Sequence, residues 1–111
     1  MDNMTTFTVI NNKLVDSVTI ATFTASSSVN ISSVSGYSVH MIWTGTPTGT
    51  LSIKGSNDNS NFSLVTSVST GGTAGQSLTN IEKAHYNFVR VEYTHSSGTG
   101  DLTVYISGKN I

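Results

Sequence analysis

Oxygen-bearing side chains gather in one short segment of the chain, at residues 57 to 61. Asn57, Asp58, Asn59, Ser60 and Asn61 offer the carboxylate, amide and hydroxyl oxygens that Ca²⁺ prefers as ligands. The segment has only one carboxylate, however, and it lacks the glycine and the distal glutamate of an EF-hand loop. The same residue types close tight turns, because their short side chains bond to the neighbouring backbone. We therefore expect a hairpin turn here and no metal site.

The other residues that could carry acid–base or metal chemistry are scattered along the chain. His40, His85 and His95 do not have the spacing of zinc ligands. The acidic residues include no obvious pair on one strand face, which glycoside hydrolysis would require. The many serines show no G-x-S-x-G nucleophile motif. We therefore predict a protein that is not an enzyme and that uses no cofactor.

Aromatic residues offer a different chemistry, because flat apolar sugar faces stack on aromatic rings while Asn and Asp side chains bond the hydroxyl groups. Core packing is the alternative for most of the five residues in question, the single tryptophan and the four tyrosines. Trp43 precedes Thr44 and Gly45 at the end of a predicted strand, where we expect partial exposure. If a ligand is bound, the predicted contact residues are Trp43, Tyr37, Asn57, Asp58, Asn59 and Asn61.

Arg90 and Glu92 are two residues apart in the segment FVRVEY, so they share one face of a predicted strand. Such residues can pair with each other or across neighbouring strands. We expect a solvated or subunit-contacting strand face here in preference to a ligand clamp, since exposed charge pairs are common and weak.

Alternation of apolar and polar residues runs through the whole sequence and predicts β-strands. The segment around residues 57 to 61 then joins the two arms of a hairpin, and residues 37–44 form the most apolar and most central strand. We expect a turn at Asn11-Asn12, a mobile loop at 69–75, an irregular segment at 76–84 with one helical turn at 80–84, and a tight loop at 95–101. Strands are expected at residues 6–10, 15–25, 29–34, 37–44, 50–54, 62–68, 86–94 and 102–108.

This pattern of about eight short strands, without a long helical segment, predicts an all-β protein, namely an antiparallel β-sandwich or jelly roll. The length of 111 residues predicts a single domain over 1–111. The buried face of residues 37–44 consists either of Val39, Met41 and Trp43 or of His40 and Ile42, because a one-residue slip inverts every side chain. The other predicted core residues are Leu51, Ile53, Phe88, Val89, Val91, Leu102, Val104 and Ile106.

Charge and composition exclude several classes of function. The net charge is −1, only 10% of residues are charged, and the five basic residues are scattered, so we expect no nucleic-acid partner. No apolar run is long enough to span a bilayer, and the first residues lack the pattern of a secretory signal, so we expect synthesis in a cytosol and no membrane partner. Without cysteine, stability must come from core packing, from subunit contacts or from both.

Two segments, GTLSIKGSNDNSNFSLV and FVRVEYTHSSGTGDLTVYISGKN, resemble known families and together cover about the last two-thirds of the chain. The first resembles a hairpin, and the second a strand, of discoidin domains, which are coagulation-factor type C, galactose-binding-like jelly rolls. The second segment is also similar to small β-sandwich proteins encoded in bacteriophage structural gene clusters, including capsid decoration, head-fibre and tail-associated proteins.

The phage resemblance implies a non-enzymatic virion protein, assembled in the host bacterial cytoplasm, that binds other virion proteins such as the major capsid or tail protein. We expect a capsid decoration or other virion surface protein that forms a homo-oligomer, with a trimer favoured. The predicted subunit contacts are Phe7 and Val9 of a possible N-terminal arm over residues 1–10, together with Arg90 and Glu92. The alternative is a carbohydrate-binding or host-attachment module that contacts a surface glycan with its loop-tip aromatic and Asn/Asp residues.

Overall fold

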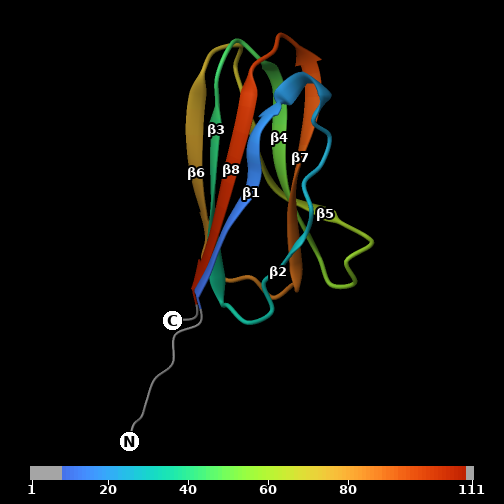
Figure 1. Cartoon of the computed structure of the whole chain (residues 1–111). Helices are drawn as coiled ribbons and strands as arrows, with labels where there is room; N and C mark the ends of the chain where they lie inside the picture. The colour runs from blue at the N-terminus through green and yellow to red at the C-terminus, as the bar shows by residue number, and fades with distance from the viewer. Residues whose placement is uncertain (1–8, 110–111) are drawn as a thin grey trace, which may run out of the picture.

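The computed structural model describes residues 9–109, which form two four-stranded antiparallel sheets packed face to face (Figure 1). The first sheet has the order β1 (Val9–Thr19), β8 (Asp101–Lys109), β3 (Gly36–Trp43) and β6 (Gly75–Ile81). The second has the order β2 (Val29–Asn30), β7 (Phe88–Ser97), β4 (Thr48–Ser56) and β5 (Ser63–Ser69). A 3₁₀ turn at Ile20–Thr22 leads from the first sheet toward the second. The prediction of an antiparallel β-sandwich is confirmed.

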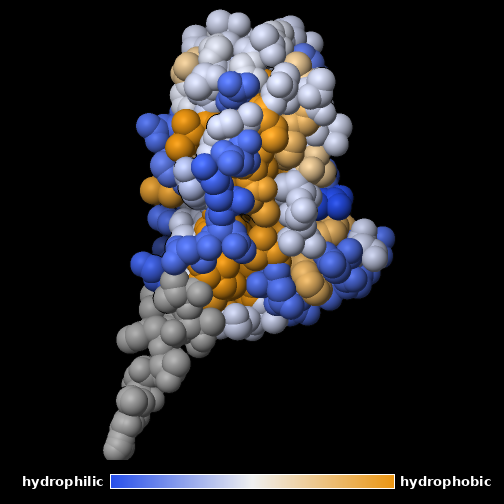
Figure 2. Space-filling view, viewed as in Figure 1, coloured by the Kyte–Doolittle hydropathy of each residue, from blue (hydrophilic) through white to orange (hydrophobic). Residues whose placement is uncertain are grey.

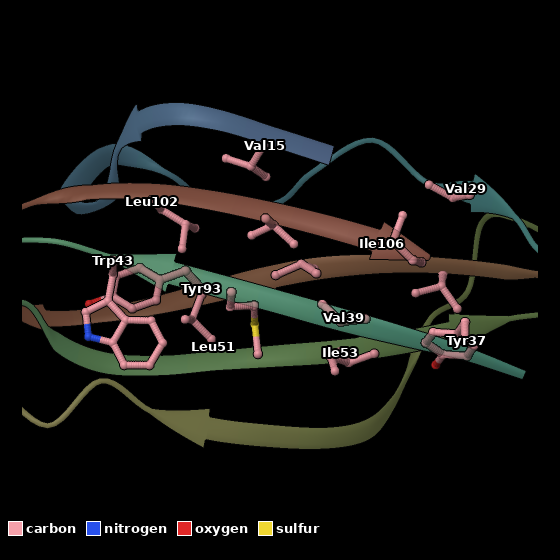
Figure 3. Close-up of a cluster of buried hydrophobic side chains, with 14 of the residues drawn as sticks. Val15, Val29, Tyr37, Val39, Trp43, Leu51, Ile53, Tyr93, Leu102 and Ile106 are labelled. Carbon is pink, nitrogen blue, oxygen red and sulfur yellow. The ribbon is translucent and has the colours of Figure 1, made fainter. Parts of the chain in front are cut away.

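The core lies between the two sheets and consists of side chains that alternate along each strand. Val39, Met41 and Trp43 point inward from β3, so the first of the two predicted sets is correct, while His40 and Ile42 lie on the outer face. Each buried aliphatic or aromatic side chain contributes about 1.5–3 kcal/mol relative to exposure. Figure 3 shows this core, whose other central members are Leu51, Ile53, Val89, Val91, Leu102, Val104 and Ile106.

Phe88 was predicted to belong to the core, but it is only partly buried. It precedes the fully buried Val89 on β7, and successive strand residues point to opposite faces. Phe88 therefore belongs to the outer side of the second sheet, where it pairs with Ser56 of β4 and Asn30 of β2.

The predicted hairpin is present as β4 and β5, with the turn in the expected place. Asn59 has a φ of 61°, the left-handed conformation that asparagine tolerates better than most residues. The pairing of the two strands slips by one residue between Ile53 and Lys54, so that Ile53 lies opposite Thr66 but Lys54 lies opposite Leu64. This bulge bends β5 at the edge of the second sheet.

The predicted turn at Asn11-Asn12 is wrong, because β1 runs through both residues. Asn11 pairs with Ser107 and Asn12 with Ile106 of β8, so hydrogen bonding to the neighbouring strand overrides the local preference of asparagine for turns. The irregularities in β1 come later, between residues 13 and 18, and Ser17 has a φ of 49° there. The strand ends at Thr19, well before the predicted end at residue 25.

The segment 76–84 was predicted to be irregular with a helical turn, and this is also wrong. Residues Gly75–Ile81 form β6, which pairs with β3 from Gly75 opposite Trp43 to Ile81 opposite Tyr37. Its sequence, GQSLTNI, has few β-branched residues and therefore a low strand propensity. The regular pairing with β3 stabilises the strand instead. Elsewhere, β2 is shorter than predicted, and β7 continues to Ser97, so the loop to β8 is only Gly98–Gly100.

Candidate interaction surfaces

A row of side chains from all four strands crosses the outer face of the first sheet. Lys13 of β1 pairs with Tyr105 of β8, Tyr105 with His40 of β3, and His40 with Leu78 of β6. We call these four residues the Tyr105 row. Leu78 is 64% exposed and Tyr105 41% exposed, which makes them two of the most exposed large apolar side chains among the described residues. The row therefore presents apolar surface to solvent on a face that is otherwise mostly polar, apart from Ile42.

Contacts within the Tyr105 row hold its rings and its charge in place. The Lys13 Nζ atom lies 5.6 Å from the centroid of the Tyr105 ring, a cation–π contact. The centroids of the His40 and Tyr105 rings are 6.4 Å apart, and His40 Nε2 lies 2.7 Å from Gln76 Oε1. Lys13 also pairs with Asp16 at 3.0 Å, and this bond is the main cause that raises the pKa of Lys13. Asp16 thus compensates the charge of the row, and Gln76 bonds to its histidine.

Hydroxyl and amide groups flank the row on both sides. Figure 2 shows hydrophilic and apolar groups interleaved on the side from which β1 and β8 are seen. Such a face, on which Asp16 compensates the charge of Lys13, suits contact with another protein surface, where Tyr is enriched. The flanking residues, in register across the sheet, are Asn11, Ser107, Ser38 and Asn80 on one side and Thr103, Ile42 and Gln76 on the other.

The outer face of the second sheet carries a closed group of charges instead. Arg90 donates from Nε to Glu92 Oε2 at 2.8 Å, and Lys54 Nζ of the neighbouring β4 lies 3.1 Å from Glu92 Oε1. The Arg90 guanidinium also stacks over the Phe62 ring at 4.1 Å from its centroid. Partial burial raises the pKa of Glu92, but the bonds and charges of Lys54 and Arg90 outweigh it, so the pKa lies below its usual value.

The pairing expected for Arg90 and Glu92, with each other and across strands, is present in the structure. These charges are satisfied by one another within the chain, which leaves few free bonds for an external ligand. Their predicted role as subunit contacts stays a prediction.

The loop from Asn57 to Asn61 is organised around the carboxylate of Asp58. Asp58 Oδ1 accepts the backbone N–H groups of Ser60 and Asn61 at 2.9 and 2.8 Å, together with the Ser56 hydroxyl at 2.8 Å. Its Oδ2 accepts the side-chain amide of Asn61 at 2.7 Å. These bonds, the backbone N–H of Asn61 foremost, hold the pKa of the Asp58 carboxyl well below its usual range. Both carboxylate oxygens of Asp58 are therefore bonded within the turn.

A hollow of about 460 Å³ lies beside this loop. Asn57, Asp58 and Asn61 line one part of it, and Leu64 and Tyr86 supply apolar walls. Amide groups and an aromatic ring thus meet at this hollow, and this is the combination expected for a sugar site.

Trp43 and Tyr37, predicted as ligand contacts, lie in the core instead. Trp43 is only 5% exposed and its Nε1 donates to the Thr73 carbonyl at 2.8 Å, so the expected partial exposure is wrong. The inward alternation of β3 continues to its last residue, which sequence position alone did not reveal. Tyr37 is 4% exposed and its hydroxyl lies 2.7 Å from that of Tyr86. Burial, followed by this bond, raises the pKa of Tyr37 above its usual value.

Within residues 9–109, no group of three or more His, Cys, Asp or Glu side chains is placed to hold a metal ion. The described part of the chain also contains no helix that is long and apolar enough to cross a membrane. Phe7 lies outside the described residues, and Val9 begins β1, opposite Lys109 of the same chain.

Leu78 and Tyr105 were not predicted as surface contacts. Tyr105 could have been found, since it lies between the inward Val104 and Ile106 in LTVYIS and must point outward. Leu78 could not be found in this way, because its segment GQSLTNI lacks the alternation that would assign its face. The alignment of the row across four strands depends on their register, which one sequence does not reveal.

No protein-family model matches this sequence, and no curated protein matches it either. Solved structures do resemble the fold. The SPBc2 prophage-derived protein YomS has a TM-score of 0.72 at 11% identity, with 99% of this chain and 100% of that chain covered. A structure described as Bacillus endospore appendages, a novel family of disulfide-linked pili, has a TM-score of 0.55 at 18% identity and covers 100% and 96%.

A chain of the infectious bursal disease virus Gt strain has a TM-score of 0.59 at 10% identity. The alignment covers 94% of this chain but only 32% of the viral chain, so the likeness concerns one part of that larger protein. At these identities the comparisons show the β-sandwich fold alone. They do not confirm the discoidin part of the sequence resemblance.

Proposed function

We propose that this protein is a non-enzymatic structural component of a bacteriophage virion and that it binds neighbouring virion subunits through the outer face of its first sheet. The Tyr105 row is the observation that carries the proposal. Exposed Tyr and Leu side chains aligned in one row on a charge-compensated face resemble the centre of a protein–protein interface. Tyrosine adds a large contact area with few rotatable bonds, which limits the entropy lost on binding.

The similar folds support a structural role. They belong to a prophage-derived protein, a spore-appendage pilus and a chain of a virus. None of these three structures is described as an enzyme. The phage resemblance of the C-terminal segment points the same way.

The proposed mechanism is attachment to a symmetric lattice as a capsid decoration or other surface protein. A contact centred on one tyrosine row is modest for a single copy, and binding at many equivalent positions of a shell raises the overall avidity. A homo-oligomer would engage several neighbouring capsid or tail subunits at once, and the phage resemblance favours a trimer.

The test is to purify particles of the phage that encodes this chain by density gradient and to quantify the chain in them by mass spectrometry. We expect a fixed copy number relative to the major capsid protein. The variant Tyr105→Ser should lower that copy number about tenfold, the effect of losing a central contact residue. Leu64→Ser is the matched control, because Leu64 is 60% exposed but lies on the second sheet. Absence of the chain from particles, or full occupancy by Tyr105→Ser, would overturn the proposal.

A glycan-binding or host-attachment module is the second candidate, and the hollow beside the Asn57–Asn61 loop is the observation in its favour. Its ligand contacts would be the Asn side chains and Tyr86, since Trp43 and Tyr37 are buried. A glycan array decides the matter with Asn57→Ala as the site variant. Specific binding that this variant abolishes would support the candidate, and a uniformly negative array would oppose it.

A further inference from the structure

Each sheet of the sandwich ends in two edge strands, and three of these four edges are protected against pairing with another chain. Strand β1 is irregular between residues 13 and 18 and carries the Lys13–Asp16 ion pair. Strand β2 spans only two residues, and β5 is bulged at Val65, where its pairing with β4 slips. Bulges, charges and short length are the usual ways in which proteins block edge-to-edge association.

Strand β6 has none of these protections. It pairs with β3 over seven consecutive residue pairs without a shift in register, and its sequence GQSLTNI contains no charged residue and no proline. Figure 1 shows it at the open edge of the first sheet, next to β3. A regular, neutral edge strand is a ready template for another extended strand.

The five central side chains of β6, from Gln76 to Asn80, are chemically symmetric about the middle residue, Leu78. On each side of Leu78 comes a hydroxyl residue, Ser77 or Thr79, and then an amide residue, Gln76 or Asn80. Gln76, Leu78 and Asn80 lie on the exposed outer face, while the residues between them are partly buried on the inner face. A strand with this symmetry is complementary to an antiparallel copy of itself.

We propose that β6 pairs antiparallel with β6 of a second copy of this chain, about a two-fold axis at Leu78. The two first sheets then form one continuous eight-stranded sheet. Leu78 lies opposite the Leu78 of the second copy, Ser77 opposite Thr79, and Gln76 opposite Asn80. The five central residues of β6 thus meet residues of like chemistry, which apolar packing and amide or hydroxyl hydrogen bonds stabilise, while Gly75 lies opposite Ile81 at each end.

Charges near the ends of β6 agree with this register. Continued outward, the pairing places Glu82 opposite Ala74 and Lys83 opposite Thr73, so neither charge meets its own copy across the axis. The two Tyr105 rows, each ending at Leu78, join into one row across the dimer. Dimerisation therefore doubles the surface that we propose for virion contact.

The contact is small, since one seven-residue edge buries less than the roughly 1,200 Å² of a stable interface. We therefore expect a dimer that forms in a concentration-dependent way and is reinforced on a symmetric lattice. The inference deepens the proposed homo-oligomer by naming its contact, and a two-fold edge contact gives dimers rather than the trimer favoured from the resemblance.

Disulfide trapping tests the contact directly, because the chain has no cysteine of its own. In the variant Leu78→Cys the two thiols lie directly opposite, at a Cα separation of about 4.5–5.5 Å that a disulfide spans. With oxidised glutathione as the oxidant, we expect this variant to cross-link about tenfold faster than Leu64→Cys, because pairing raises the effective thiol concentration. Leu64 is the matched control, being 60% exposed against 64% for Leu78, but on the protected edge β5.

Two further measurements fix the register and guard against chance collisions. A mixture of Gln76→Cys and Asn80→Cys chains should form the mixed disulfide faster than either variant cross-links with itself. The weight-average mass of the native chain in sedimentation equilibrium should rise from 11.7 kDa toward twice that value with concentration, whereas Leu78→Lys should remain at 11.7 kDa.

Equal cross-linking of Leu78→Cys and Leu64→Cys would overturn the inference, and so would a mass that tends to three chains. These experiments use purified protein without particles. Their failure would therefore remove the β6 contact and leave the virion role open, whereas absence from virions would remove the role and leave the dimer.

Discussion

Two buried tyrosine hydroxyls in this core have opposite environments, and removing them should have opposite effects on stability. The Tyr37 hydroxyl bonds to that of Tyr86 at 2.7 Å. The Tyr93 hydroxyl is buried and has no hydrogen-bond partner in the described part of the chain; it lies against the backbone at Gly49. The perturbation is the same in both cases, a change of Tyr to Phe that removes one oxygen atom and little else.

The expected magnitudes follow from these environments. Tyr37→Phe removes a hydrogen bond whose net contribution to the free energy of unfolding is about 1 kcal/mol, so it should destabilise by that amount. Tyr93→Phe removes a polar group that was buried without compensation, at a cost of roughly 1–3 kcal/mol, so it should stabilise by about 1 kcal/mol. For a chain of this size, each change corresponds to about 4 °C in Tm, in opposite directions.

Thermal and urea unfolding, followed by circular dichroism, measures both variants against the native chain. Tyr105→Phe is the control, because its hydroxyl is on an exposed side chain and its loss should change stability by less than about 0.5 kcal/mol. The double variant of Tyr37 and Tyr86 should cost less than the sum of the two single ones, as expected for a bonded pair. A Tyr93→Phe variant that loses as much stability as Tyr37→Phe would refute this reasoning.

Three further predictions concern the loop, the tryptophan and the charge group. Because the bonds in the turn lower the pKa of Asp58 in the folded state, its carboxylate stabilises the fold above about pH 4 and loses this contribution as the pH falls further. Acid titration of the unfolding free energy should therefore be less steep for Asp58→Asn than for the native chain; equal slopes would contradict the assignment. Trp43→Phe should destabilise by about 2 kcal/mol through lost volume and the lost bond to Thr73, and native Trp43 fluorescence should shift to the red on unfolding. An already red-shifted native emission would contradict its burial. Glu92→Gln should cost about 1 kcal/mol at low salt, because it leaves two basic side chains unpaired, and the loss should shrink as salt is added; a salt-independent loss would point to packing instead.

The strands that were predicted well are those whose buried residues are large or β-branched and alternate with polar residues. The segments YSVHMIWT and LTVYIS alternate so regularly that both could be predicted as strands of the core. The structure then shows that β3 buries its odd-numbered residues. The hairpin around Asp58 was also predictable, since Asn, Asp and Ser leave the backbone few alternatives to a turn.

Pairing between distant strands accounts for what the sequence did not predict. Asn11 and Asn12 favour a turn locally, but β8 supplies a continuous hydrogen-bonding partner that keeps β1 extended. Strand β6 is a strand because β3 is its neighbour, and its own residues are weak strand formers. Both errors concern edge strands, in which pairing with the one neighbouring strand overrides local propensity.

The same limit applies to the candidate surfaces. Aromatic chemistry points to Trp43 and Tyr37 as ligand contacts, but residue type does not show which strand face a side chain occupies, and both side chains are in the core. The Tyr105 row depends on three separate register relations, Lys13–Tyr105, Tyr105–His40 and His40–Leu78, none of which is local in sequence. A surface site on a sheet can therefore be predicted only when the pairing register of its strands is known.

The most direct test of the proposed virion role is to titrate purified protein onto phage particles assembled without it and to measure the bound copies per particle. Our account predicts saturable binding at a copy number set by the symmetry of the shell or tail, weakened about tenfold by Tyr105→Ser and unchanged by Leu64→Ser. Failure of the protein to bind, or binding that never saturates, would contradict a role as a structural component of the virion.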